Sequence, residues 1–198
     1  LDGGGGNDVA DYSDTSFGVT VDFTQTTIKA PYTGVFVATA TSSSTAVGNS
    51  GKDVLINIET VVGSSGNDKF IFSSASQAAY GGLGVDTVVT NVASYALLDG
   101  SGIENLETTF ATGATLMGNS SDNAIKGNKG NDILSGGAGA DTFTVGTGNT
   151  GDHTLTGGAG IDTFSITLNA AGSDTISVTD FVGGTDVANI TVLDSGVV

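Results

Sequence analysis

The chain has 198 residues, a net charge of −16, 32 Gly and a single Pro. It contains no Cys or Trp, its positive charges are all Lys, and all but three of its acidic residues are Asp. This charge disfavours nucleic acid and anionic membrane as partners, and no apolar run reaches the roughly 18 residues needed to cross a bilayer. Asp beside Gly is typical of turns and of metal sites, so the composition favours divalent cations.

Residues 1–62 predict degenerate coils of a β-solenoid. Residues 3–11 (GGGGNDVAD) carry a nine-residue pattern with Gly at positions one, two and four, Asp at six and an apolar residue at eight. Residues 19–23, 35–37 and 54–56 read as strands, with a surface excursion near Pro31. Since the chain opens inside a repeat and without an initiator Met, we expect a segment of a longer protein.

Residues 63–117 predict isolated repeats separated by spacers, and residues 118–165 predict the regular part of the fold. The isolated copies are 63–71 (GSSGNDKFI) and 81–89 (GGLGVDTVV). The regular copies are 118–126 (GNSSDNAIK), 127–135 (GNKGNDILS), 136–144 (GGAGADTFT), 148–156 (GNTGDHTLT) and 157–165 (GGAGIDTFS). Every copy is apolar at position eight, at Ala10, Phe70, Val88, Ile125, Leu134, Phe143, Leu155 and Phe164. Residues 166–198 are expected to cap the last coil, because an open edge invites aggregation.

The period itself predicts the architecture. The residues around position eight have strand character, while the Gly-rich part can turn sharply. Two copies then make one flattened coil, so copies nine residues apart lie on opposite edges and copies 18 apart stack at about 4.8 Å. We therefore expect an all-β, right-handed parallel β-roll, or β-helix solenoid, with its position-eight side chains in the core.

Stacked carboxylates at this spacing repel one another, by about 1 kcal/mol in water and more where water is excluded. Calcium takes oxygen ligands at about 2.3–2.6 Å, so two oxygens on opposite sides of the ion match the coil spacing. Mg²⁺ fits less well because it needs shorter bonds and keeps its waters. The spacing thus predicts several Ca²⁺ ions in the turns, held by Asp side chains and backbone carbonyls.

These nonapeptides resemble the RTX (repeats-in-toxin) calcium-binding repeats of proteins exported by type I secretion. The spacers at 53–59 and 103–106, and the tail around 174–176, Asp180 and Asp186, also resemble such arrays. The resemblance implies a chain that stays unfolded where Ca²⁺ is scarce and folds outside the cell. It implies a secreted protein of a Gram-negative-type bacterium, located outside the cell or on its surface.

The candidate metal ligands follow from the repeat positions. The strongest are Asp132, Asp141 and Asp162, with Asp141 expected to stack on Asp162. Asn123 or Asp122 would replace the usual ligand in the copy that stacks under 136–141, and Asp8, Asp68 and Asp86 rank lower. The turn residues expected to offer carbonyls, and the remaining acids, are Gly127, Lys129, Gly130, Gly136, Gly137, Ala138, Gly139, Gly157, Gly158, Ala159, Gly160, Asp152, Asp180 and Asp186.

One copy departs from the pattern. His153 stands at position six, Asp152 comes one place early, and both are expected to face Asp132. Imidazole is a poor Ca²⁺ ligand, so this site is expected to be weak or empty, and His153 itself to be solvated. The three extra residues at 145–147 call for a bulged coil. The alternative for all turn Asp residues is that they cap β-turns without a metal.

The sequence offers no support for catalysis. The lone His lies in a repeat turn, Cys nucleophiles are absent, and there is no Gly-x-Ser-x-Gly motif. We expect a non-enzymatic segment of a cell-surface structural protein, such as an S-layer subunit, filament or adhesin. Such a protein could assemble with itself into a lattice or filament, or bind other surface components. The alternative is the C-terminal secretion and folding domain of a type I-secreted protease, lipase or toxin.

Overall fold

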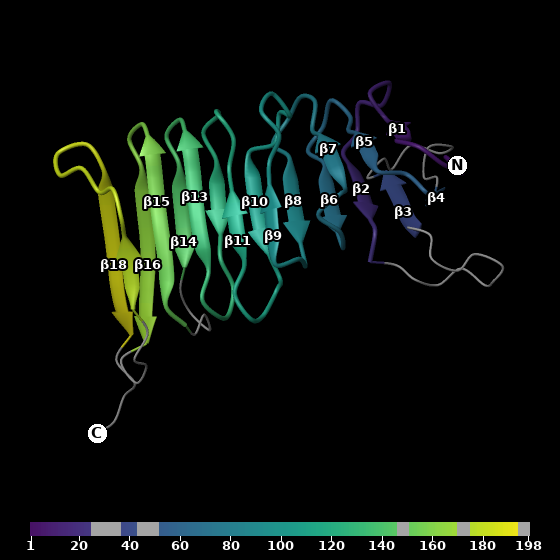
Figure 1. Ribbon diagram of the computed structural model, residues 1–198. Coiled ribbons are helices and arrows are strands. Elements are labelled where there is room, and N and C mark those ends of the chain that lie inside the picture. Colours follow the sequence, from purple (N-terminus) through teal and green to yellow (C-terminus); the bar gives the residue numbers. More distant parts are fainter. Residues whose placement is uncertain (25–36, 43–51, 146–150, 170–174, 194–198) are drawn as a thin grey trace. The chain divides into compact units, whose positions relative to one another are not determined.

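The computed structural model describes residues 1–24, 37–42, 52–145, 151–169 and 175–193 (Figure 1). Across these ranges the regular structure is β-strand, with no helix that could span a membrane. The strands are β1 (Val9–Asp11), β2 (Val19–Asp22), β3 (Val37–Ser42), β4 (Lys52–Ile56), β5 (Thr60–Val62), β6 (Lys69–Phe72), β7 (Ala78–Tyr80), β8 (Thr87–Thr90), β9 (Ser94–Ala96), β10 (Asn105–Thr108), β11 (Thr115–Met117), β12 (Ala124–Lys126), β13 (Ile133–Ala138), β14 (Thr142–Val145), β15 (His153–Ala159), β16 (Thr163–Asn169), β17 (Ile176–Val178) and β18 (Val187–Leu193).

The chain forms two compact units, and each is described by itself. Unit 2 holds residues 90–100 and 104–198, and contains the regular repeats. Its described strands form two parallel sheets, ordered β10-β12-β14-β16-β18 and β9-β11-β13-β15-β17. Successive strands alternate between the sheets, so the chain winds as coils, and strands of one sheet lie side by side (Figure 1). The predicted all-β parallel solenoid is confirmed.

Unit 1 holds residues 1–89 and 101–103, and it is less regular. The described strands β1, β5 and β7 pair in parallel, as does β2 with β6. However, β3 pairs antiparallel with both β2 and β4, where continued parallel coils were expected. No nonapeptide lies between residues 12 and 62, so no Gly-rich turn directs the chain around a coil, and antiparallel neighbours need only a direct connection. The predicted strand residues 35–36 and Pro31 lie outside the described residues.

The apolar position of the repeat builds the core, as predicted. All eight position-eight side chains are at most 1% exposed. In unit 2 they align in two rows, because Leu106, Ile125, Phe143 and Phe164 are in register in one sheet. Tyr95, Leu116, Leu134 and Leu155 are in register in the other. The rings of Phe143 and Phe164 stack at 5.0 Å and 8°, so identical positions pack on one another from coil to coil.

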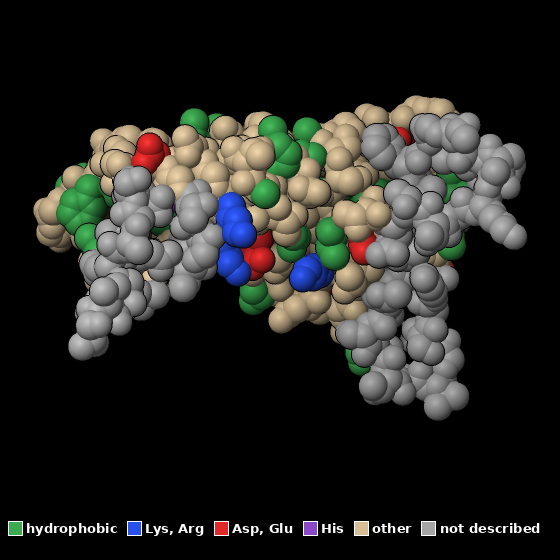
Figure 2. Space-filling view, turned by 90° about the horizontal axis from the view of Figure 1, so that it is seen from below, with side chains coloured by type: hydrophobic (Ala, Val, Ile, Leu, Met, Phe, Trp, Pro, Cys, Tyr) green, Lys and Arg blue, Asp and Glu red, His purple; other side chains and the backbone are tan. Residues whose placement is uncertain are grey.

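One face of the molecule carries few charges (Figure 2). Glu107 and Lys126 are register partners on β10 and β12, an opposite-charge pair across neighbouring strands. Figure 2 shows a face on which Lys side chains lie beside acidic ones, among mostly uncharged surface. Most of the described Asp residues lie in the turns between strands.

The tail was expected to cap the last coil. In its described residues, β17 pairs with β15 and β18 pairs with β16, both in parallel. Ile190 is in register with the buried Ile166, yet it is 61% exposed. This part of the tail therefore extends the roll by one more coil.

Neighbouring residues of β13 provide a test of the core. Leu134 is fully buried and Ile133 is 52% exposed. Leu134→Ala should lower the free energy of unfolding by about 2–5 kcal/mol, because it leaves a cavity between coils. Ile133→Ala, which removes a side chain of the same size, should change it far less. Urea unfolding in saturating CaCl₂ measures both, and equal losses would contradict the two-row core.

Candidate metal centre

The position-six residues of unit 2 form two columns, one at the start of each sheet. The strand registers align Glu104, Asn123, Asp141, Asp162 and Asp186 in one column, here called the acidic edge. They align Ala114, Asp132, His153 and Ile176 in the other, here called the mixed edge. Parallel pairing thus converts a sequence period of two repeats into stacked side chains.

On the acidic edge, each carboxylate links two coils. The Asn123 N–H donates to Asp141 Oδ1 at 2.8 Å, and the Asp141 N–H donates to Asp162 Oδ1 at 2.9 Å. The Asp162 N–H in turn donates to Asp186 Oδ1 at 3.1 Å. The expected stacking of Asp141 on Asp162 is confirmed. The spacing is 18 residues for Asn123 and Asp141 but 21 for Asp141 and Asp162, so the longer coil keeps the ladder intact.

The second oxygen of Asp141 is the exception in this ladder. Asp141 is 1% exposed, and its Oδ2 is buried with no hydrogen-bond partner in the described part of the chain. A buried carboxylate oxygen without a donor carries a large desolvation cost. The arrangement therefore calls for a further positive partner at this point.

The surroundings of that oxygen fit a cation. A methyl group added at Gly136 would collide with Asp141 Oδ2 and would lie 2.6 Å from the carbonyl oxygen of Gly157, one coil further on. A side-chain oxygen and a backbone carbonyl of the next coil therefore lie close together beside Gly136, a packing that only Gly permits. Such hard oxygen donors suit Ca²⁺ better than softer transition metals.

The same geometry recurs at other turns. The space beside Gly118 is bordered by Asn123 Oδ1 and the Gly136 carbonyl. In unit 1, the space beside Gly63 is bordered by Asp68 Oδ2 and the Gly81 carbonyl, and that beside Gly81 by Asp86 Oδ2 and the Gly102 carbonyl. No three His, Cys, Asp or Glu side chains of the described ranges come together as a metal-binding group. The recurring unit is therefore one side-chain oxygen with one carbonyl.

Several predicted ligands already have backbone donors. Asp68 accepts hydrogen bonds from the Val19 N–H at 2.6 Å and from the Ser64 N–H at 2.6 Å. Its own N–H donates to Asp86 Oδ1 at 2.7 Å. Asp8 Oδ2, by contrast, is buried without a hydrogen-bond partner among the described residues. Asp8 and Asp141 are thus the predicted ligands whose unpartnered oxygens point most directly to a cation.

In the tail, Asp180 accepts the N–H groups of Gly157 and Gly158, and Asp186 accepts that of Val182. Both acids therefore cap turns, as the repeat acids do.

The remaining predicted residues lie on the outer side of the turns. Asp122 and Asp152 are exposed, and each accepts a backbone N–H of the next coil, from Ala140 at 2.7 Å and Thr175 at 2.8 Å. Asn67 and Asn131 do the same for Val85 and Asp152. This outer ladder at position five was missed by the sequence analysis, although an Asn or Asp at that position signals it. Of the predicted turn residues, Gly127, Lys129, Gly130, Gly139 and Gly160 lie between strands, whereas β13 includes Gly136, Gly137 and Ala138, and β15 includes Gly157, Gly158 and Ala159.

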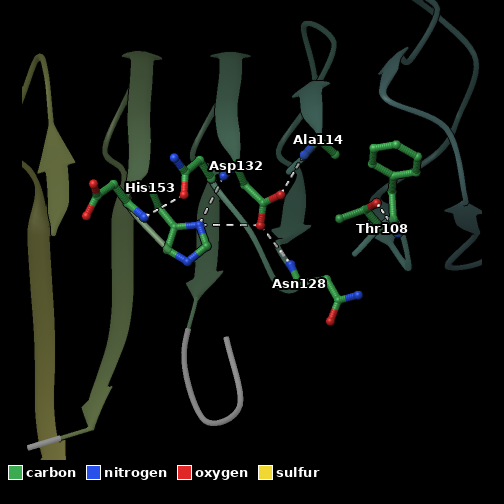
Figure 3. Close-up of polar contacts among 8 residues, drawn as sticks. Thr108, Ala114, Asn128, Asp132 and His153 are labelled. Atoms are coloured by element: carbon green, nitrogen blue, oxygen red, sulfur yellow. Dashed lines mark hydrogen bonds and ion pairs between the residues drawn. The ribbon is translucent and has the colours of Figure 1, made fainter. Parts of the chain in front are cut away.

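His153 was expected to be solvated, and that was wrong. It is 2% exposed, because it begins β15 in phase with the buried Leu155. Its Nδ1 lies 3.3 Å from both the backbone N and Oδ2 of Asp132 (Figure 3). The expectation that Asp132 faces this turn is confirmed, and the imidazole is an integral part of it.

The sequence around these turns was compared with known proteins. Residues 117–151 match the family model for the RTX calcium-binding nonapeptide repeat (4 copies). RTX nonapeptide repeats bind Ca²⁺, so the chain carries calcium-binding repeats within a β-solenoid. The matched stretch contains Asn123, Asp132 and Asp141. No curated protein matches the chain.

Burial raises the pKa of the Asp141 carboxyl from its ordinary 3.8 to about 6. The charges of Asp162 and Asp122 act in the same direction, against the hydrogen bond from Asn123. Burial also raises the pKa of Asp162, helped by Asp186 and Asp180. Without a cation, the fold thus resists ionisation of its stacked carboxyls.

This predicts the pH dependence of the metal-free chain. A folded-state pKa above the ordinary value means that protonated Asp141 favours folding, a contribution present below pH 3.8 and lost as the pH rises through about 6. In EDTA, far-UV circular dichroism should show β structure declining from pH 4.5 to 7.5. The β structure of Asp141→Asn, whose side chain stays neutral, should decline less. Superimposable curves for the two proteins would show that ionisation of Asp141 is not the cause of the decline.

Gly136 provides a steric test. Gly136→Ala places a methyl group on Asp141 Oδ2, so the Ca²⁺ concentration for half-folding should rise about tenfold, equivalent to ~1.4 kcal/mol. Gly183 has nothing within 4 Å of an added methyl group, so Gly183→Ala is the matched control and should leave the midpoint unchanged. Calcium titrations followed by circular dichroism compare them. An unchanged midpoint for Gly136→Ala would show that this space binds no ion.

Proposed function

We propose that this chain is a calcium-dependent folding segment of a secreted protein, in which Ca²⁺ binds at the turns of the roll. The observation that carries the proposal is the buried, unpartnered Asp141 Oδ2 beside the carbonyl of Gly157, within the stretch that matches RTX repeats. Asp141, Asp162 and the carbonyls around Gly136 and Gly157 are the proposed ligands in unit 2. In unit 1 they are Asp8 and Asp86, and Asp68 is left out because backbone N–H groups already donate to both of its oxygens.

Charge explains why folding would depend on the ion. The chain carries a net charge of −16, and five of its Asp side chains (Asp68, Asp86, Asp132, Asp141 and Asp162) are at most 2% exposed. Burying such groups is costly unless they are paired, so the unfolded chain is favoured where Ca²⁺ is scarce. Bound Ca²⁺ supplies the positive charge that is needed where a buried carboxylate oxygen has no hydrogen-bond donor, as at Asp141. The free energy of binding then becomes free energy of folding, which suits a chain that is exported unfolded.

For the parent protein we propose a bacterial cell-surface structural role. The long spacers, the abundance of Thr, Ser, Gly and Ala, and the absence of Arg and Cys support a structural segment. Exposed apolar side chains on the last described strand, Val187 and Ile190, support end-to-end or lateral assembly. Type I secretion and self-assembly into a lattice or filament complete this proposal.

The decisive experiment is a calcium titration of the whole chain, followed by far-UV circular dichroism from an EDTA-treated start. A cooperative change from coil to β structure in CaCl₂, and not at equal MgCl₂, is expected, because Mg²⁺ demands shorter bonds and retains its waters. Electron microscopy of the calcium-loaded sample then tests assembly. Full β structure in EDTA with no response to Ca²⁺ would leave only metal-free turn caps, and the proposal would fail.

A further inference from the structure

We infer that Ca²⁺ loads only the acidic edge of unit 2, and that on the mixed edge backbone N–H groups satisfy Asp132 while His153 replaces the second acidic ligand. The inference rests on the proposed calcium function, and it distinguishes two residues that the repeat pattern treats alike. Asp132 and Asp141 hold the same position in consecutive repeats, and both are 1% exposed. They differ in what surrounds their carboxylates.

The Asp132 carboxylate has protein partners at both oxygens (Figure 3). Its Oδ1 accepts the Ala114 N–H at 2.7 Å, and its Oδ2 accepts the Asn128 N–H at 2.9 Å. His153 Nδ1 also lies 3.3 Å from Oδ2, but that nitrogen accepts the Asp132 N–H and therefore donates no hydrogen bond to Oδ2. Asp141 accepts one N–H at Oδ1 and leaves Oδ2 without a hydrogen bond. The demand for a cation is therefore present at Asp141 and already met at Asp132.

The charges of the two columns support the same inference. The acidic edge contains four carboxylates among its five residues, with the amide of Asn123 as the fifth. The mixed edge contains one carboxylate among Ala114, Asp132, His153 and Ile176. An ion between coils of the mixed edge would meet a methyl group on one side of Asp132 and an imidazole on the other. Neither is a ligand that Ca²⁺ favours.

His153 also accepts the hydrogen bond between coils that a carboxylate accepts on the acidic edge. On the acidic edge, the backbone N–H of each position-six residue is accepted by the carboxylate of the next coil, as in Asp141 and Asp162. On the mixed edge, His153 Nδ1 receives the Asp132 N–H at 3.3 Å instead. The coil-to-coil ladder therefore continues with a neutral acceptor, and no second buried carboxylate has to be neutralised.

The test compares two isosteric variants of the whole chain, Asp141→Asn and Asp132→Asn, by counting bound Ca²⁺ with native mass spectrometry and calorimetric titration. Asn123 already occupies position six, so both variants have a precedent in this fold. Asp141→Asn should bind one ion fewer than the wild type. Asp132→Asn should keep the wild-type number of ions. Equal loss in both variants would overturn the inference while leaving the proposed function intact.

A gain-of-site variant makes the test independent of any folding defect. His153→Asp restores the repeat acid opposite Asp132, so it should bind one ion more than the wild type. An unchanged count in the folded variant would overturn the inference, because the imidazole would then not be what displaces the ion. Absence of Ca²⁺ binding by the wild type would instead refute the proposed function, so the two failures are distinguishable.

Discussion

The fold depends on one electrostatic constraint, which is that stacked turn carboxylates must be neutralised where water cannot reach them. The coils stack at strand spacing, so Asp141 and Asp162, which hold the same repeat position, lie directly beside each other. Most of the charge can be met by backbone N–H groups, as at Asp68, whose carboxylate accepts hydrogen bonds from Val19 and Ser64. Where one oxygen remains without a donor, as at Asp141, the turn needs a cation.

Position six can meet this constraint with different chemistry while the coil stays the same. Asn123 uses a neutral amide, whose Oδ1 accepts the Asn119 N–H at 2.8 Å. In unit 1, Gln77 comes directly before β7, as position-six residues come before their strands, and its Oε1 accepts the N–H groups of Ser73 and Ser74. His153 uses a ring nitrogen. The repeat therefore sets the backbone path, and the side chain at position six sets whether a turn needs metal.

The repeat period was enough to predict the parallel coils, the buried position-eight residues and the pairing of Asp141 with Asp162. These features follow from spacing alone, because parallel stacking brings equal repeat positions together. The antiparallel strand β3 could not be predicted this way, since its segment carries no repeat. The burial of His153 was missed because the prediction relied on the polarity of histidine and ignored its position in the repeat. Position six points into the turn whichever residue stands there.

An asymmetric roll is sufficient for a calcium switch. Each coil of unit 2 passes through both edges, so it closes only when the turns on both sides are stable. The mixed edge is stabilised by contacts between protein groups, such as Asp132 with Ala114 and Asn128. The acidic edge contains Asp141 and Asp162, whose pKa values are raised by burial. When these carboxyls are ionised, they repel one another and destabilise this edge. In the proposed calcium switch, ions bound along the acidic edge would therefore control every coil, while the mixed edge keeps the coils in register.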